Sequence, residues 1–338
     1  MTHLLLAAAA LALLPAAQPP AAQPAPSPGQ IVDAAKADEW IAIAPSDLLV
    51  MDLAPDTAGG ERRVVIQLMP APFSRGWIGN IRKLAAAHWW DGTSVYRVQD
   101  NYVAQWGDAD GEDPAKAKPL PVGLATVPES DYERPLDDEL RGALRDKMKA
   151  EEDALLAAFR QPADGRAEAV RRAIPRDPYS DETIAYHGWP IAVDRETQSV
   201  WPVHCYAMVG VARDLSPNTG TGSELYTVIG HAPRHLDRNI ALVGRVIAGI
   251  EHLSSLPRGP APLGVYEDPA RRVPIASVRL ASDLPEAERP RFEYLSTESA
   301  SFARYAEARQ NRRDPFFIHP AGGADICNIA VPVREITP

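Results

Sequence analysis

The chain has 338 residues, of which 45% are hydrophobic and 24% are charged, and its formal net charge is −10. This composition is typical of a soluble globular protein with one large domain or two ordinary ones, and it excludes a fibrous or fully disordered chain. The negative charge argues against a general nucleic-acid binder, because no block of Lys and Arg could follow a phosphate backbone.

The first element in chain order is an apolar run, LLLAAAALALLPAA, over residues 4–17. Such a run followed by small residues is typical of a secretory signal peptide, and it is too short and too rich in alanine for a good membrane span. We therefore predict a signal peptide over residues 1–22 and an exported protein, periplasmic if the host is a Gram-negative bacterium. An uncleaved N-terminal anchor is the alternative. A Pro/Ala-rich linker over residues 23–36 follows, and we expect its first part, up to residue 30, to be extended and structureless.

Apolar periodicity then predicts mostly strands. The first group comprises strands over 47–55 and 62–70, a helix over 74–90, and strands over 94–98 and 102–106. A long helix over 134–161, with Pro135 in its first turn, and a shorter helix over 167–174 come next. Strands return at 199–212, 223–230, 240–249 and 273–281, and a helix over 297–313 precedes a last strand over 324–336. Many strands with few helices predict a mainly β fold, a closed β-barrel with helical additions.

The sequence lacks the common motifs of hydrolases and of metal or phosphate sites. It contains no Gly-x-Ser-x-Gly, no His-Glu-x-x-His and no P-loop, and no Cys/His spacing resembles a zinc site. His231 and His235 are four residues apart, but Pro233 between them argues against a helix that presents both to a metal. Cys205 and Cys327 form either a disulfide, if the protein is exported, or two separate buried thiols.

One polar pair interrupts the apolar strands at residues 94–106. Tyr96 and Val98 alternate with Arg97, so we expect Arg97 to face outward if the other two face the barrel core. On the next strand, Gln105 shares a face with Val103. An outer surface with an arginine and a glutamine could form an open groove, and an exposed arginine without a role is the alternative.

Two separated blocks of sequence, with a helix before the first, carry a family resemblance. The first block is DGTSVYRVQDNYVAQWGD (91–108), preceded by the helix WIGNIRKLAAA (77–87), and the second is TGTGSELYTVIGHAPRHLDRNIALVGRVIAGIEHL (219–253). In order and spacing these segments resemble the cyclophilin family of peptidyl-prolyl cis–trans isomerases. The resemblance implies an eight-stranded antiparallel barrel capped by two helices. It also implies a cyclophilin-like domain over 37–281 with a helical insertion over 112–198, and a C-terminal extension over 282–338 packed on the barrel.

The resemblance also implies the site residues. Arg97 matches the catalytic arginine of the family, and Gln105 matches the groove glutamine. The implied substrate-binding residues are Tyr102, Val103, Val209, Gly210, Tyr226, His235, Leu236 and Ile240. Of these, Val209 and Gly210 match a backbone segment that pairs with the substrate. The chain departs from the family pattern at Gly210, Ile240 and Trp106, which stand in place of an asparagine, a histidine and a glycine.

The implied activity is rotation about X–Pro peptide bonds, which needs no cofactor, metal or proton transfer. We expect the partners to be proline-containing peptides and unfolded exported proteins, with no nucleic acid, and contact with the membrane only through the signal peptide. A peptide-binding chaperone or assembly factor that uses the same groove with little turnover is the alternative.

Overall fold

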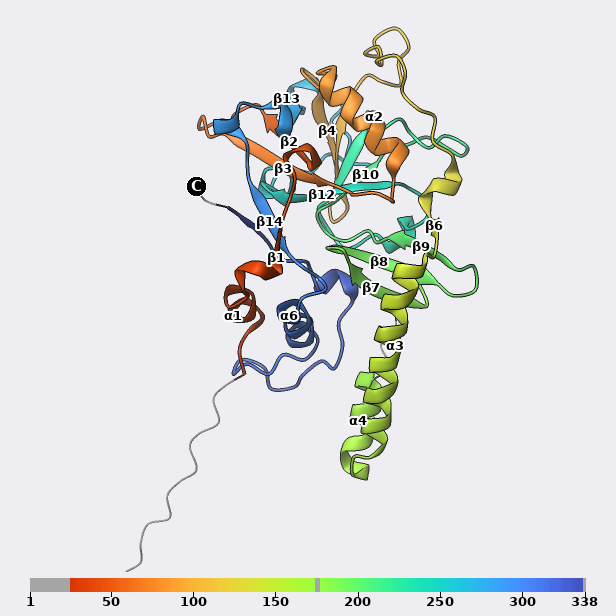
Figure 1. Ribbon diagram of the computed structural model, residues 1–338. Helices are drawn as coiled ribbons and strands as arrows, with labels where there is room; N and C mark the ends of the chain where they lie inside the picture. Colours follow the sequence, from red (N-terminus) through yellow and green to blue (C-terminus); the bar gives the residue numbers. More distant parts are fainter. Residues whose placement is uncertain (1–24, 174–176, 337–338) are drawn as a thin grey trace, which may run out of the picture.

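The computed structural model describes residues 25–173 and 177–336, and Figure 1 shows how its elements are arranged. The predicted signal peptide over residues 1–22 lies outside this part of the chain. Among the described helices, none combines the length and the apolar character that crossing a membrane requires.

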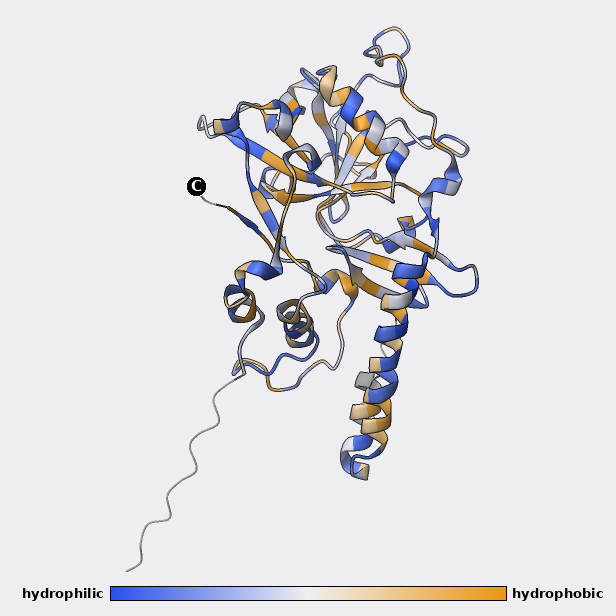
Figure 2. Cartoon of the chain, viewed as in Figure 1, coloured by the Kyte–Doolittle hydropathy of each residue, from blue (hydrophilic) through white to orange (hydrophobic). Residues whose placement is uncertain are grey.

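The centre of the molecule is a closed β-barrel of eight strands in which every neighbouring pair is antiparallel. In order around the barrel, the strands are β10 (Met208–Val211), β11 (Leu225–Val228), β5 (Val103–Gly107), β4 (Ser94–Val98), β13 (Val273–Leu280), β2 (Leu48–Leu53), β3 (Arg62–Leu68) and β12 (Leu242–Ala248). Within β3, Val64 and Ile66 belong to the main core, whereas Val65 belongs to a second apolar cluster. Hydrophobic residues accordingly recur along the barrel strands in Figure 2. The predicted mainly β fold with a closed barrel is confirmed.

Two helices pack on the barrel core, and they differ greatly in length. Helix α2 (Arg75–Ala86) buries Trp77, Ile81 and Leu84 completely. The second, α5 (Glu251–Ser254), has only four residues and buries Leu253. It cannot continue far because Pro257 follows three residues after its end.

The predicted insertion contains strands as well as helices. Helices α3 (Asp138–Phe159) and α4 (Ala163–Ala173) form a hairpin that projects from the body of the molecule (Figure 1). At its base lies a four-stranded sheet in the order β6 (Arg134–Pro135), β9 (Ser199–Pro202), β8 (Trp189–Asp194) and β7 (Glu182–Tyr186). The description of the insertion as helical was therefore incomplete.

The start of α3 differs from the sequence prediction. Asp137 is the N-cap, and its carboxylate accepts a hydrogen bond of 2.9 Å from the N–H of Leu140. Pro135 lies in β6 and not in the first helical turn. The capping preference of aspartate decides the boundary, because it satisfies a backbone donor that would otherwise lack a partner.

The apolar run predicted as one strand over 199–212 is divided between two sheets. Strand β9 ends at Pro202 and β10 begins at Met208, in the barrel. Between them the chain turns through Ala207, whose φ is 68°. The run has no polar break because both strands are buried on both faces, and such strands show no alternation in sequence.

The two ends of the described chain meet in a third sheet. Strand β14 (Phe292–Leu295) lies between β1 (Trp40–Ala42) and β15 (Val333–Glu335). The last strand is shorter than the predicted 324–336, because Ile326–Asn328 form a 3-10 turn instead. Phe292 packs in the second apolar cluster with Leu48 and Val65 of the barrel, so the C-terminal extension covers this part of the barrel surface.

The linker expected over residues 23–36 is partly helical, which corrects the prediction of an extended segment. Helix α1 (Pro28–Asp33) begins with a capping box, in which Ser27 and Gln30 accept hydrogen bonds from each other's backbone N–H. It lies beside α6 (Ala300–Gln310), and Ile31 shares a buried apolar cluster with Phe302 (Figure 1). Packing against the extension thus orders a segment whose composition favours an extended chain.

A buried arginine joins the barrel, the insertion and the extension. Arg245 of β12 donates to the side chain of Gln67 and, over 2.8 Å, to the carbonyl of Gly188. Its guanidinium lies over the rings of Trp189 and Tyr294, 4.6 and 6.0 Å from their centroids. Burial lowers the pKa of Arg245 to about 10, so the group remains charged at neutral pH.

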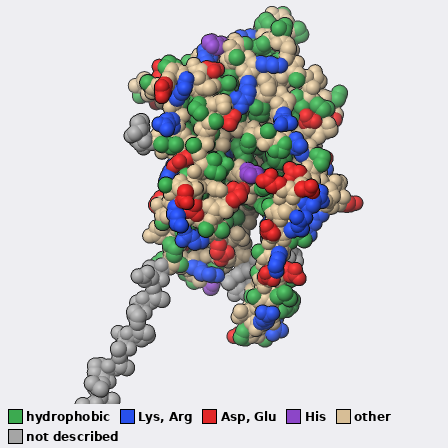
Figure 3. Space-filling model, viewed as in Figure 1, with side chains coloured by type: hydrophobic (Ala, Val, Ile, Leu, Met, Phe, Trp, Pro, Cys, Tyr) green, Lys and Arg blue, Asp and Glu red, His purple; other side chains and the backbone are tan. Residues whose placement is uncertain are grey.

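Short 3-10 turns connect the longer elements. They are η1 (Ala37–Glu39), η2 (Pro45–Asp47), η3 (Glu129–Tyr132), η4 (Arg234–Leu236), η5 (Pro269–Arg271), η6 (Ala281–Asp283), η7 (Glu286–Glu288) and η8 (Ile326–Asn328). On the face shown in Figure 3, acidic and basic side chains are interspersed.

Candidate active site

Four of the predicted site residues form a row across neighbouring barrel strands. Arg97 of β4 is paired with Gln105 of β5, Gln105 with Tyr226 of β11, and Tyr226 with Gly210 of β10. Cross-strand partners lie about 5 Å apart and can contact one another. Residues from positions 97 to 226 of the chain therefore meet on one outer patch of the barrel.

Arg97 is held by three hydrogen bonds, and each uses a different nitrogen. Its Nε donates to the carbonyl of Leu263 over 2.7 Å, one terminal nitrogen donates to Oε1 of Gln105 over 2.9 Å, and the other donates to Oε1 of Gln99 over 2.5 Å. A guanidinium has five N–H donors, so two remain for a bound molecule. Arg97 is half-buried, which fixes its orientation while leaving it accessible.

The alternation expected at this strand is wrong for Tyr96. A β-bulge places Tyr96 and Arg97 together opposite Gln105, while Val95 and Val98 are fully buried in the core. A bulge adds one residue to a strand and so interrupts the two-residue period of side-chain directions. The outward position of Arg97 is as expected, but Tyr96 does not face the core. Its hydroxyl accepts a hydrogen bond from the amide of Gln105 and donates one of 2.9 Å to Glu224.

Apolar side chains lie on the β11 side of this pair. Tyr102 stacks on His235, with 6.3 Å between ring centroids and 13° between planes. Leu236 and Ile240 are half-buried and pack against the main core, and Val103 is nearly fully covered. His235 is exposed. Together they offer an apolar surface on which a small ring could lie.

The side chain of Tyr226 lies directly against Gly210 on the neighbouring strand. A Cβ atom on Gly210 would lie less than 3.0 Å from the phenol oxygen of Tyr226. The tyrosine therefore occupies the space that a side chain at position 210 would need. Its hydroxyl is 2.8 Å from Nε2 of His204, and burial raises the pKa of Tyr226 well above its usual value. This hydroxyl stays protonated, and the departure at Gly210 follows from the presence of Tyr226.

The substrate-pairing role expected for the backbone of Val209 and Gly210 stays a prediction. At both residues β10 is paired on one edge with β11 and on the other with β12. Their backbone groups therefore face neighbouring strands and not an open edge. Arg213, two residues after β10, donates to the carbonyl of Asn239 over 3.0 Å, next to Ile240.

Trp106 lies inside the barrel. Its side chain is fully buried, and its ring centroid is 5.7 Å from that of Trp90. Alternation along β5 places Trp106 and Ala104 on the core side, and Gln105 between them on the outer side. The departure at Trp106 thus fills the core and leaves the groove unchanged.

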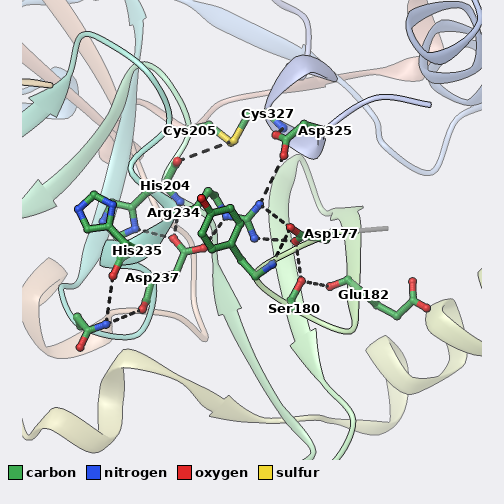
Figure 4. A network of polar contacts seen from close by, with 12 residues as sticks. Asp177, Ser180, Glu182, His204, Cys205, Arg234, His235, Asp237, Asp325 and Cys327 are labelled. Atoms are coloured by element: carbon green, nitrogen blue, oxygen red, sulfur yellow. Dashed lines mark hydrogen bonds and ion pairs between the residues drawn. A yellow bond between two sulfur atoms is a disulfide. The ribbon is translucent and has the colours of Figure 1, made fainter. Parts of the chain in front are cut away.

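A buried polar chain begins at Tyr226 and continues through His204 toward the insertion, and Figure 4 shows its part from His204 to Asp177. Nδ1 of His204 is 2.8 Å from the carboxylate of Asp237, and its Nε2 is 2.8 Å from the Tyr226 hydroxyl. Asp237 also accepts from Nε of Arg234 over 2.7 Å, and Arg234 donates to both carboxylate oxygens of Asp177, over 3.3 and 2.7 Å. The sequence reading missed this chain, because its residues come from separate segments of the sequence.

The pKa directions agree with a charged cluster. Burial alone would raise the pKa of Asp177, but hydrogen bonds from Arg234 and Ser180 and the positive charge of Arg234 outweigh it and lower the pKa. Burial opposes the charge of Arg234 as well, yet its bonds to Asp177 and Asp237 raise the pKa. Asp177 and Arg234 are therefore both ionised at neutral pH.

The two cysteines are joined beside this cluster. Cys205 and Cys327 form a disulfide that links the turn after β9 to the C-terminal extension, across a sequence separation of 122 residues. Of the two alternatives left by the sequence, the structure has the disulfide. Cys205 directly follows His204, so the crosslink lies next to the residue that holds Tyr226 (Figure 4).

Two hollows of the described surface lie away from these residues. One is lined by Pro72, Arg134 and Tyr186, and the other by Leu144, Met148 and Arg195. Within residues 25–173 and 177–336, no group of three or more His, Cys, Asp or Glu side chains could hold a metal ion. The candidate active site does not coincide with either hollow.

A closed antiparallel barrel with an outward Arg–Gln pair is the arrangement that the sequence resemblance implies. The family model described as cyclophilin type peptidyl-prolyl cis-trans isomerase/CLD matches residues 57–280. The chain therefore belongs to the cyclophilin-type peptidyl-prolyl cis–trans isomerases.

A solved structure shows the same fold. A crystal structure of cyclophilin AquaCyp293 from Hirschia baltica is similar to this chain with a TM-score of 0.59 and 20% identity, covering 88% of this chain and 93% of that one. A Cryptosporidium parvum cyclophilin type peptidyl-prolyl cis-trans isomerase, solved in the presence of the dipeptide Ala-Pro, matches with a TM-score of 0.34 and 10% identity over 68% of this chain and 98% of its own. No curated protein matches the sequence.

Proposed function

We propose that this chain catalyses rotation about X–Pro bonds at the outer barrel patch, with Arg97 as the catalytic residue. The observation that carries the proposal is the guanidinium of Arg97, fixed by three protein acceptors and left with two donors beside an apolar surface. Tyr102, Leu236 and Ile240 supply that surface, and Tyr226 is nearly buried beneath it. Gln105 orients Arg97 through the 2.9 Å hydrogen bond.

The mechanism follows from the electronic structure of the amide. Resonance gives the C–N bond partial double-bond character, and the barrier to rotation is about 18–20 kcal/mol. When the bond twists, the prolyl nitrogen loses this resonance and its lone pair can accept a hydrogen bond. A donor from Arg97 then binds the twisted state more strongly than either planar state, which is the requirement for catalysis. Arginine suits the role because its charge is permanent and its donors are held in a plane.

The finer proposal is that the enzyme assists the folding of exported proteins. Two features support it. The apolar run over residues 4–17 is typical of a signal peptide. The Cys205–Cys327 disulfide is of a kind that persists in oxidising compartments, such as the bacterial periplasm. The clients are then unfolded exported chains with accessible prolines.

A protease-coupled assay on a proline-containing peptide tests the activity. We expect the wild type to accelerate cis–trans exchange and Arg97→Ala to lose most of that acceleration, with Arg63→Ala, an exposed arginine of β3, as the control. A wild type that suppresses aggregation of an unfolded client but shows no rate above background would instead support a chaperone. Fractionation of the host and mass spectrometry of the mature N-terminus test export, and an intact N-terminus on cytoplasmic protein would contradict it.

A further inference from the structure

The candidate active site contains a second polar chain, which leads away from Arg97 and ends at a carboxyl group. Oε1 of Gln105 accepts from Arg97, and Nε2 of the same amide donates to the hydroxyl of Tyr96. The Tyr96 hydroxyl donates to Oε2 of Glu224 over 2.9 Å, and Oε1 of Glu224 accepts from the N–H of Asp108 over 2.7 Å. Every bond in this chain has a defined direction.

Those directions depend on the charge of Glu224. An ionised carboxylate can only accept hydrogen bonds, so Tyr96 must donate to it. The Tyr96 oxygen then accepts from Gln105, and the amide must turn its NH₂ toward Tyr96 and its carbonyl toward Arg97. If Glu224 carries a proton, its O–H can donate to Tyr96 instead. The Tyr96 hydroxyl is then free to donate to the carbonyl of Gln105, which turns the NH₂ of that amide toward the guanidinium.

The backbone is shaped to hold the carboxyl group in this place. Gly107 has a φ of 145°, and a Cβ atom there would lie less than 3.0 Å from the Glu224 carboxyl oxygens. No basic side chain of the described residues forms an ion pair with Glu224, whereas Asp91 pairs with Arg279. The group is thus covered and hydrogen-bonded but not neutralised by a cation.

We propose that Glu224 is a positioning residue whose protonation state sets the orientation of the Gln105 amide, and through it the presentation of Arg97 to the substrate. The inference rests on the proposed function of Arg97 and Gln105. Glu224 does not touch the substrate and transfers no proton to it. It makes the rate of a reaction without proton transfer depend on pH.

The surroundings place this titration near neutral pH. Burial is the main cause that raises the pKa of Glu224 to about 7, and the negative charge of Asp108 also raises it. The hydrogen bonds from the Asp108 N–H and from Tyr96 lower this pKa but do not outweigh burial. The groups that face Glu224 are therefore Tyr96 from β4 and Asp108 from the end of β5. Burial, followed by the charge of Glu224, raises the pKa of Tyr96 far above its usual value, so Tyr96 keeps its proton throughout.

The test is the pH profile of kcat/KM between pH 5.5 and 8.5, measured by NMR exchange on a blocked Ala-Pro peptide without titratable groups. We expect the wild type to be about tenfold faster on the alkaline side of a midpoint near pH 7, the size expected for one hydrogen bond to a charged group. In Glu224→Gln, the amide oxygen takes the Asp108 N–H and the NH₂ faces Tyr96. This variant mimics the protonated state, so its rate should be low and independent of pH.

Two further variants complete the design. Tyr96→Phe removes the link between Glu224 and Gln105 and should also give a flat profile. Glu251→Gln, an exposed carboxyl-to-amide change in α5, should keep the wild-type profile. Unfolding temperatures of all variants verify that they are folded.

The outcomes separate this inference from the proposed function. A wild type without acceleration at any pH contradicts the proposed function. An active wild type with a flat profile overturns the role of Glu224 alone. A midpoint near pH 7 that persists in Glu224→Gln also overturns it, because the titration then belongs to another group.

Discussion

Replacing Arg234 by methionine should destabilise the protein far more than the loss of an ordinary surface arginine. The Arg234 side chain is only 2% exposed, and those of Asp177 and Asp237 are 8% and 6% exposed. Methionine fills similar space but leaves two buried carboxylates without their cation. Breaking a buried ion pair in this way costs about 3–5 kcal/mol of unfolding free energy.

The pH dependence of this loss has a defined sign. The folded-state pKa of Asp177 is lowered, so its contribution to stability is present above the unfolded pKa near 3.8 and is lost as pH falls through the folded value. Without Arg234, burial raises the pKa of Asp177, so this carboxyl group takes up a proton more readily. The difference between wild type and Arg234→Met should therefore be large at pH 7 and smaller at pH 4.

Urea unfolding at both pH values, followed by tryptophan fluorescence, measures the difference. Arg63→Met is the control, because the Arg63–Asp52 pair lies on the surface, with side chains 44% and 34% exposed. Such pairs contribute about 0–1 kcal/mol. Equal losses for the two variants at pH 7, or a loss for Arg234→Met that does not shrink at pH 4, would refute the reasoning.

The remaining predictions concern three other features. The Cys205→Ser, Cys327→Ser double variant should lose up to about 5 kcal/mol of unfolding free energy in urea, because the disulfide closes a separation of 122 residues. Mass spectrometry of the unreduced wild type should show no free thiols, and two free thiols would contradict the disulfide. Gly210→Ala should cost about 1–3 kcal/mol through its clash with Tyr226, and an unchanged melting temperature would show that the ring moves aside freely. Glu224→Gln should be more stable than the wild type at pH 8 but not at pH 5, because the pKa of Glu224 is raised and its ionised carboxyl group lowers the free energy of unfolding only at higher pH. Urea unfolding that gives the same difference between the two proteins at both pH values would contradict this prediction.

The sequence predicted the barrel well because its strands carry their own signals. Alternation and turn residues identify the strands from 47 to 107, and the pairing of Arg97 with Gln105 follows from a short hairpin. The bulge at Tyr96 could not be predicted in the same way. A bulge leaves no mark in a short apolar pattern, so alternation assigned Tyr96 to the wrong face.

The parts that failed depend on contacts between distant segments. Asp177 and Arg234 meet only because the insertion sheet folds back beside the barrel, and neither has a motif around it. Helix α1 is ordered by packing on α6, which is more than 260 residues away in the chain. For the same reason, the sequence does not indicate that Val209 of β10 is paired with both β11 and β12.

The most direct test of the central claim is the rate of X–Pro exchange in Arg97 variants, measured by NMR on a blocked Ala-Pro peptide. The account predicts that Arg97→Ala lowers kcat/KM by about 100- to 1,000-fold, the usual effect of removing a transition-state hydrogen-bond donor. Arg97→Lys should recover little of this, because an ammonium cannot hold Gln105, Gln99 and Leu263 while it also donates to the substrate. An Arg97→Ala variant that folds and exchanges the peptide at the wild-type rate would contradict the account.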